Sequence, residues 1–165
     1  MKNRREQGFT IIEMVALLVM TTTALLFLYH ITSLTLESKR LQIVARELGR
    51  DTSETCFRFS QESRTVRSNI DLLIATNNEV RFINTTGTTI RYWLSGNNLM
   101  RNNQILLDQM NALNFTYYDE NGTQIANPTI NPASTNVRSV RMNLTVQREG
   151  KNLSMMSEAQ LRNVK

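Results

Sequence analysis

The chain is poor in the residues that bind metals or form covalent cross-links. Its 165 residues include one cysteine, Cys56, and one histidine, His30. One cysteine cannot form an intramolecular disulfide or a cysteine-rich zinc cluster. We expect Cys56 to be a small buried apolar residue and His30 to be an interfacial helix residue. Asp119 and Glu120 could bind calcium together with loop carbonyls, but two adjacent acids in a turn are usually solvated.

Motifs of catalysis are also missing. The sequence contains no glycine-rich phosphate-binding loop and no nucleophile motif. We therefore expect no catalytic residue, no metal, no cofactor and no small-molecule substrate, and we expect that the chain is not an enzyme.

Proline and charge are sparse in the N-terminal part. The two prolines are Pro128 and Pro132, so no proline kink is predicted in the apolar segment near the N-terminus. From Phe9 to Leu36 the only formal charge is that of Glu13. A carboxylate at the centre of a bilayer costs roughly 2.5–3.5 kcal/mol, so acids in membrane spans are rare and usually have a partner. Glu13 is therefore the most informative residue of the chain.

The apolar segment is long enough to cross a membrane. Met14–Ile31 contains 18 residues without formal charge, which is about the minimum for a spanning helix. Lys2, Arg4 and Arg5 precede this segment, and the next basic residue is Lys39. By the positive-inside rule, this distribution predicts a cytoplasmic N-terminus.

A specific motif precedes the apolar segment. It consists of Arg4, Arg5 and Gly8, followed by Phe9, Thr10, Ile11, Ile12 and Glu13. This motif resembles the class III signal of type IV pilins and type II secretion pseudopilins. The resemblance implies that a prepilin peptidase cuts between Gly8 and Phe9 and methylates the new N-terminus at Phe9. It also implies that Glu13 supports assembly. A plain signal anchor, with Glu13 as a tolerated interfacial charge, is the alternative.

Cleavage at this site would create a partner for Glu13. No lysine or arginine lies between Arg5 and Lys39. The new α-amine of Phe9 would have a pKa near 7.7–8.0 and would be mostly protonated. It would lie one helical turn from Glu13, or it would face the Glu13 of a neighbouring copy.

The residues beyond the apolar segment continue a helical pattern. Gly49 lowers helix stability by about 1 kcal/mol relative to alanine but does not end the pattern. A helix from Phe9 to about Ser60 would be roughly 78 Å long. Its first half would face lipid and its second half would be amphipathic. The recurring positions are Leu34, Leu41, Val44, Leu48, Thr55 and Phe59.

The remaining sequence predicts strands and turns. Val140–Val146 alternates most clearly between apolar and polar residues. Gly96 and Asn97 supply a hairpin turn, and residues 121–136 form a surface loop. The expected strands are Glu79–Asn84, Thr88–Leu94, Leu99–Asn102, Ile105–Met110, Leu113–Tyr118, Val140–Val146 and Leu153–Met156.

The predicted architecture is α+β, with one long N-terminal helix packed on an antiparallel β-sheet head. We divide the chain into a leader (1–8), a transmembrane and assembly helix (9–36) and a periplasmic pilin-like head (37–165) that includes the amphipathic half of the helix. No internal repeat and no second domain are expected.

Fragments of the head are similar to PilW-type minor pilins and to minor pseudopilin J. The fragments are Tyr92-Trp93-Leu94, Leu99-Met100-Arg101, residues 113–122 and Leu161-Arg162-Asn163. The resemblance implies a minor pilin or pseudopilin that takes part in assembly of a type IV pilus or type II secretion pseudopilus. Implied partners are prepilin peptidase, the inner membrane, and other pilins or pseudopilins through the N-terminal helix. The implied location is the inner membrane, with a single pass and a periplasmic head, followed by incorporation into a filament.

A binding module is the alternative function. The net charge is +5, or +3 without residues 1–8. Basic patches bind DNA through its phosphates, and DNA-uptake pili occur in the resembling family. Because the basic residues alternate with acids, a solvated or subunit-contacting face is the ordinary interpretation. The alternative is thus a membrane-anchored tip adhesin or DNA-uptake competence pseudopilin. The basic clusters are Arg58, Arg64 and Arg67, and Arg138, Arg141 and Arg148.

Overall fold

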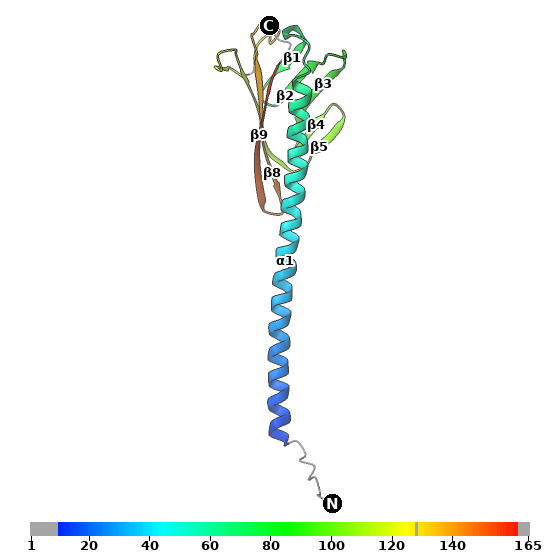
Figure 1. Cartoon of the computed structure of the whole chain (residues 1–165), viewed down its shortest axis with the longest axis vertical. Helices are drawn as coiled ribbons and strands as arrows, with labels where there is room; N and C mark the ends of the chain where they lie inside the picture. Colours follow the sequence, from blue (N-terminus) through cyan, green and yellow to red (C-terminus); the bar gives the residue numbers. More distant parts are fainter. Residues whose placement is uncertain (1–9, 128, 162–165) are drawn as a thin grey trace, which may run out of the picture. The chain divides into compact units, whose positions relative to one another are not determined.

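The computed structural model describes residues 10–127 and 129–161, which form one long helix followed by short strands (Figure 1). The chain divides into two compact units, Met1–Ile43 and Val44–Lys165, and each is described by itself. The elements are α1 (Ile11–Ser63), the 3₁₀ helix η1 (Asn69–Asp71), β1 (Leu72–Ala75), β2 (Glu79–Ile83), β3 (Thr89–Ser95), β4 (Asn98–Arg101), β5 (Gln104–Leu107), β6 (Met110–Tyr118), β7 (Gln124–Ile125), β8 (Ser139–Arg148) and β9 (Lys151–Gln160).

The predicted long helix and α+β fold class are confirmed. The helix α1 begins at Ile11 and ends at Ser63, three residues beyond the predicted end. It continues through Gly49, where a Cβ atom would meet no other atom within 4 Å. Phe9, the predicted first residue, lies outside the described residues.

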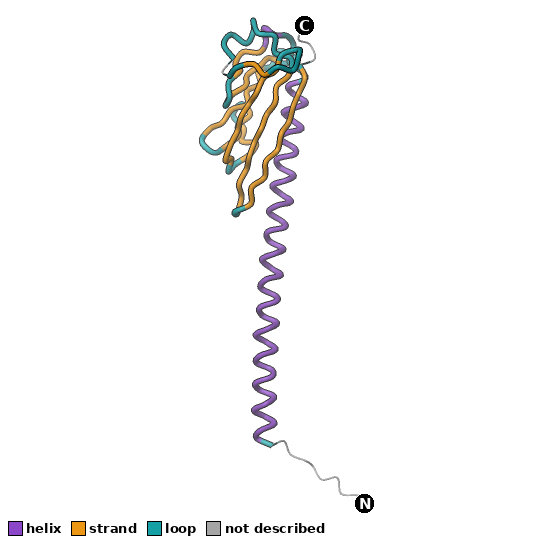
Figure 2. The backbone as a smooth tube through the Cα atoms, turned by 90° about the vertical axis from the view of Figure 1, so that its left-hand side faces the viewer, coloured by secondary structure: helices purple, strands orange, loops and turns teal. Residues whose placement is uncertain are grey.

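The second unit contains two antiparallel sheets, which Figure 2 shows beside the part of α1 that belongs to this unit. The first sheet has the order β1-β2-β3-β4-β5, so each strand pairs with its neighbour in sequence. The second has the order β7-β6-β8-β9. Its longest hairpin joins β8 to β9, where Arg148 faces Lys151 across Glu149 and Gly150. Both turn residues have positive φ (47° and 74°), as type I′ hairpin turns require.

The strand predictions hold for most of the head and fail in three places. The strand β1 (Leu72–Ala75) was not predicted, because its four residues show no alternation that distinguishes them from a loop. The predicted strand Ile105–Met110 is divided: β5 ends at Leu107, and Met110 belongs to β6. The strand β6 therefore begins at Met110 instead of the predicted Leu113. The predicted loop 121–136 also contains the two-residue strand β7.

Asparagines connect the two sheets at the edge of β6. The carbonyl of Asn77, in the turn between β1 and β2, accepts a hydrogen bond from the backbone N–H of Phe115 (2.8 Å). The carbonyl of Asn97, between β3 and β4, accepts one from the N–H of Met110 (2.8 Å). On the second sheet's own side, the amide of Asn127, in the loop after β7, donates to the Phe115 carbonyl (2.6 Å). Turns of the first sheet therefore satisfy backbone groups of β6 that no neighbouring strand reaches.

Phe59 on α1 lies between the two sheets. Its ring is fully buried. The ring centroid lies 5.3 Å from that of Tyr92 on β3, nearly perpendicular to it, and 5.7 Å from that of Phe115 on β6. One aromatic side chain of the helix thus contacts the first and the second sheet. The buried face of α1 consists of Leu48, Thr52, Thr55, Cys56, Phe59 and Ser63.

We predict that Phe59→Ala strongly destabilises the head, by about 3–5 kcal/mol, because it leaves a cavity between both sheets. Phe57→Ala is a matched control on the same helix, since Phe57 is 66% exposed, and its effect should stay within about 0.5 kcal/mol. Urea unfolding of the full chain in detergent, followed by fluorescence of the single tryptophan Trp93, measures both. Equal losses for the two variants would contradict the central position of Phe59.

The outer face of the first sheet carries a charge network centred on Glu79. Arg91 donates two hydrogen bonds to the Glu79 carboxylate (2.8 and 2.9 Å), and Arg81 donates a third (2.9 Å). The Arg91 guanidinium also lies 4.3 Å from the centre of the Trp93 ring. The hydrogen bonds from Arg91, and with a smaller effect the one from Arg81, hold the pKa of Glu79 below its ordinary value, although burial opposes them.

We predict a pH-dependent contribution from this network. Because the pKa of Glu79 is lower in the folded chain, the ionised carboxylate stabilises the fold above its ordinary pKa of 4.5, and this contribution is lost as the pH falls through the folded-state pKa. The difference in unfolding free energy between wild type and Glu79→Gln should therefore shrink from pH 7 to pH 3, as measured by urea unfolding. Glu120→Gln, at an exposed side chain, serves as the control for the loss of one carboxylate. A constant difference for Glu79→Gln would refute the prediction.

Candidate functional site

The candidate site is the N-terminal part of α1 together with the residues before it. The predicted leader residues Lys2, Arg4 and Arg5 lie outside the described residues, as do Gly8 and Phe9. Cleavage between Gly8 and Phe9, methylation of Phe9 and the pairing of its amine therefore stay predictions.

Glu13 lies in the first turn of α1 and has a local partner. Its carboxylate accepts hydrogen bonds from the backbone N–H of Thr10 (2.9 Å) and from the Thr10 hydroxyl (3.0 Å). In return, the Thr10 hydroxyl accepts one from the backbone N–H of Glu13 (3.3 Å). This reciprocal pattern is a capping box. The negative charge also lies at the end of the helix where the dipole favours it.

The role of Thr10 was missed in the sequence analysis, although the signal was present. Thr10-Ile11-Ile12-Glu13 has the spacing of a capping box before an apolar run. The interaction means that the Glu13 carboxylate is hydrogen-bonded within its own chain before any other partner arrives. Two hydrogen bonds to Thr10 would have to be given up or shared when a cation binds Glu13.

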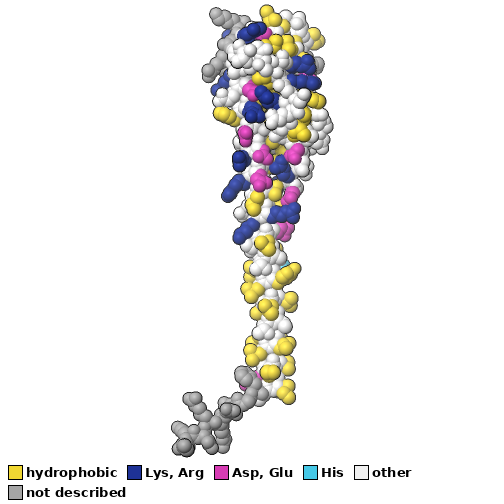
Figure 3. Space-filling model, turned by 90° about the vertical axis from the view of Figure 1, so that its right-hand side faces the viewer, with side chains coloured by type: hydrophobic (Ala, Val, Ile, Leu, Met, Phe, Trp, Pro, Cys, Tyr) yellow, Lys and Arg dark blue, Asp and Glu magenta, His cyan; other side chains and the backbone are white. Residues whose placement is uncertain are grey.

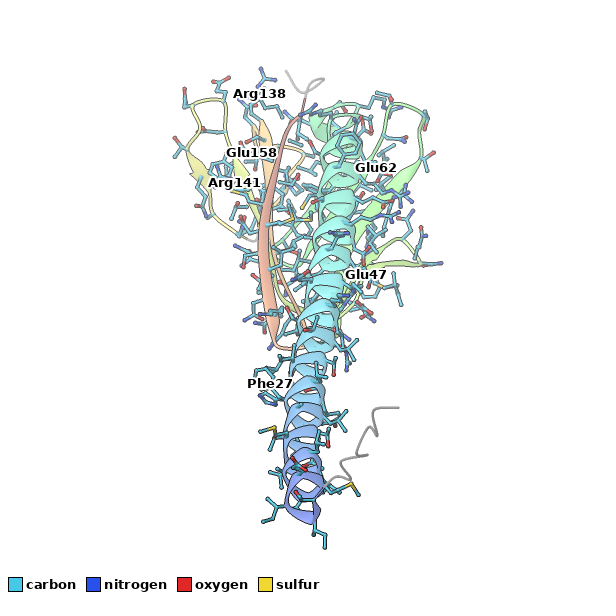
Figure 4. The ribbon with its side chains drawn as sticks, turned by 60° about the horizontal axis from the view of Figure 1, so that its bottom comes forward. Phe27, Glu47, Glu62, Arg138, Arg141 and Glu158 are labelled. Carbon is cyan, nitrogen blue, oxygen red and sulfur yellow. The ribbon has the colours of Figure 1, made fainter. Side chains whose placement is uncertain are left out.

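The helix that follows is apolar and exposed. It is long and apolar enough to cross a membrane, with a mean hydropathy of 2.3 in its most apolar 18-residue window and no burial of that window within the chain. Such a surface requires a nonaqueous environment or another apolar surface. Phe27 is one of these side chains (Figure 4). All are at least 44% exposed: Ile11, Ile12, Met14, Val15, Leu17, Leu18, Val19, Met20, Leu25, Leu26, Phe27, Leu28, Tyr29, Ile31, Leu34 and Leu36.

Hydroxyl groups in this stretch are satisfied within the helix. Thr21 donates to the carbonyl of Leu18 (3.0 Å), and Thr23 donates to that of Val19 (2.9 Å). Thr22 makes the same kind of bond to Leu18 (2.9 Å). The helix is continuous across these threonines. Their polar groups are therefore compatible with lipid, where an unsatisfied hydroxyl would be costly.

The remaining chemical candidates are accounted for by the fold. Cys56 is buried, and burial raises the pKa of its thiol to about 11, so it is a poor nucleophile. Asp119 accepts hydrogen bonds from the backbone N–H groups of Asn121 (2.9 Å) and Thr123 (2.8 Å), which makes it part of a turn. His30 is an exposed residue of α1. Within residues 10–127 and 129–161, no group of three or more potential metal ligands comes together.

Half of the arginines considered for DNA binding are paired with acids. Arg141 bonds to Glu158 (2.9 Å; Figure 4), and Arg148 bonds to Asp108 (2.6 Å). Arg67 binds Asp71 through two hydrogen bonds of 3.0 Å, and these, with a bond from Ser68, lower the pKa of the Asp71 carboxyl. These three guanidinium groups are thus partly neutralised before any phosphate could approach. No ion pair is found for Arg58, Arg64 or Arg138 among the described residues.

No protein-family model matches the chain, and no curated protein is significantly similar to it.

Proposed function

We propose that this chain is a prepilin-type structural subunit, a minor pilin or pseudopilin that takes part in filament assembly at the inner membrane. The observation that carries the proposal is the exposed apolar part of α1, whose only charged side chain from Ile11 to Leu36 is Glu13 in the first turn. The residues before it, Gly8 and Phe9, supply the junction of a class III signal. The head, built from two antiparallel sheets on the second half of the helix, is compatible with a pilin-like fold.

The leader defines the first steps. Lys2, Arg4 and Arg5 keep the N-terminus in the cytoplasm, and prepilin peptidase cuts after Gly8 and methylates Phe9. The subunit then waits in the inner membrane, anchored by α1, with its head in the periplasm. In this scheme the chain is a substrate of the peptidase and has no catalytic activity of its own.

The Glu13 carboxylate has two alternative partners in this scheme. Before assembly, Thr10 donates both of the hydrogen bonds found in the structure. During assembly, the α-amine of Phe9, from the same or a neighbouring copy, supplies a positive charge. An ion pair offsets the cost of burying the carboxylate among apolar helices, which hydrogen bonds to Thr10 alone offset less. The requirement for this pair would set the stagger between neighbouring helices.

The subtype rests on the head. The fragments similar to PilW-type minor pilins and minor pseudopilin J fall on β3 and β4, which form one hairpin, and on β6. They favour a minor subunit over a major one. A DNA-uptake or adhesin role would have to use Arg58, Arg64 and Arg138, since the other three candidate arginines bind acids in the head.

Processing can be tested directly by mass spectrometry of the mature N-terminus, with and without co-expressed prepilin peptidase. We expect a chain that begins at N-methylated Phe9 only when the peptidase is present. A bulky residue in place of Gly8 should block cleavage, whereas Gly8→Ala should still be cut in part. An intact Met1 terminus in both samples would leave a plain signal anchor as the better interpretation.

Two variants separate the effect of the Glu13 charge from the effect of its hydrogen bonds in the capping box. Glu13→Ala removes both, whereas Glu13→Gln keeps an acceptor for Thr10 and removes the charge. We expect both variants to be cleaved normally and to be lost from filaments to a similar extent, as measured by immunoblotting of sheared filaments against membrane fractions. Normal assembly of Glu13→Ala would exclude the proposed role. Loss with alanine alone would assign the effect to the capping box.

A further inference from the structure

Charged side chains on the exposed face of α1, within the second unit, are sorted by sign. Arg46 and Arg50 lie four residues apart and form a basic stripe. Glu47 and Asp51, also four apart, form an acidic stripe with Glu54 three residues further on. Residues three or four apart lie on one side of a helix, so the stripes run side by side. Figure 3 shows basic and acidic side chains next to one another along this part of the chain.

Two pairs within the stripes are unfavourable in an isolated subunit. Like charges four residues apart destabilise a helix, as for Arg46 with Arg50 and Glu47 with Asp51. Arg50 also has opposite charges at helical spacing, Glu47 three residues before it and Glu54 four residues after it. Neither of these ion pairs forms in the described part of the chain. The side chains are therefore available to another molecule.

Most of these charges have no partner in the part of the chain that the structure describes. Asp51 lies 3.4 Å from Arg148, which binds Asp108 more closely at 2.6 Å. The other four stripe residues form no hydrogen bond or ion pair through their side chains within residues 10–127 and 129–161. Glu47 projects from α1 in Figure 4. The four are Arg46, Glu47, Arg50 and Glu54.

A hollow of about 240 Å³ lies beside the acidic stripe. Asp51, Glu54 and Arg58 line it from α1, and Ile105 and Leu106 line it from β5. Ile105 is 55% exposed. A long basic side chain suits such a site, because its aliphatic stem can cover apolar surface while its charged end reaches a carboxylate. The hollow therefore complements the acidic stripe as a receptor for arginine.

We propose that α1 helices of neighbouring copies of this chain pair through these stripes, with the basic stripe of one copy bound to the acidic stripe and hollow of the next. The inference rests on the proposed function and adds the surface by which heads recognise one another. The two stripes are adjacent but distinct, so the contact joins unlike surfaces. Such a contact leaves one stripe free at each end, so it can repeat from copy to copy within a filament.

A charge swap tests the proposal in full-length protein in the membrane. In one variant, Arg46→Glu/Arg50→Glu, both stripes are acidic; in the other, Glu47→Lys/Glu54→Lys, the acidic stripe becomes basic. Each variant alone should lose self-association, because every contact then joins like charges. When the two are co-expressed, every contact between unlike copies is complementary, and association should return to the wild-type level. Energy transfer between two labelled populations of the chain provides the measurement.

Three controls make the result specific. Arg64→Glu/Arg138→Glu changes the net charge as much as the first variant does, outside the stripes, and should associate like wild type. Urea unfolding monitored by Trp93 should show that all variants are folded. Raising the salt from about 0.05 to 0.5 M should weaken wild-type association, since exposed charges are screened.

Several outcomes would overturn the inference. These are wild-type association of either variant alone, failure of the folded mixture to recover, equal loss in the net-charge control, or a wild-type chain that does not associate with itself. Mass spectrometry of Phe9 in the same membranes separates this result from the proposed function. A chain that is processed at Phe9 but insensitive to the swap refutes the stripes alone, whereas an unprocessed chain refutes the filament role.

Discussion

The head depends on the burial of one aromatic side chain of α1 between two sheets. Phe59 contacts Tyr92 of the first sheet and Phe115 of the second. Backbone hydrogen bonds from turns of the first sheet to β6 also join the two sheets. A hydrogen-bonded group nearby reinforces this position: the Tyr92 hydroxyl donates to Glu62 (2.7 Å), and Arg101 binds the same carboxylate (2.9 Å). The helix thus covers both sheets and also contacts each of them through specific side chains.

The elements that local patterns specify could be predicted from the sequence. Alternation in Val140–Val146 identified β8, and Gly96 with Asn97 identified the turn between β3 and β4. The division into two sheets could not be predicted, since it depends on hydrogen bonds between residues far apart in the chain. The carbonyls of Asn77 and Asn97 that meet β6 are examples, because an asparagine in a turn carries no signal of the strand it will meet.

The candidate site was predicted with an incomplete account of its chemistry. Glu13 was identified from the absence of other charges around it, and that argument searched only for a cation. The structure supplies hydrogen-bond donors from Thr10 instead, which a capping-box reading of residues 10–13 would have found. In the proposed assembly, the carboxylate would therefore not start unpartnered in an apolar segment. It would exchange hydrogen bonds from Thr10 for a charged partner, and the driving force would be the difference between the charged and the neutral partner.

The proposed contact depends on the charge stripes lying on an ordered part of α1. Flexible surface ion pairs contribute little, because ordering two long side chains costs as much as the pair gains. In this head the opposite face of the same helix segment is fixed by buried residues from Leu48 to Ser63, so the backbone beneath Arg46, Glu47, Arg50 and Glu54 is ordered before any contact forms. Association then needs to order side chains only, which lowers its entropic cost. The buried face and the charged face of α1 therefore act together. Packing of the buried face against the sheets fixes the positions of the exposed charges, and the proposed contact requires this fixed surface to match a second helix.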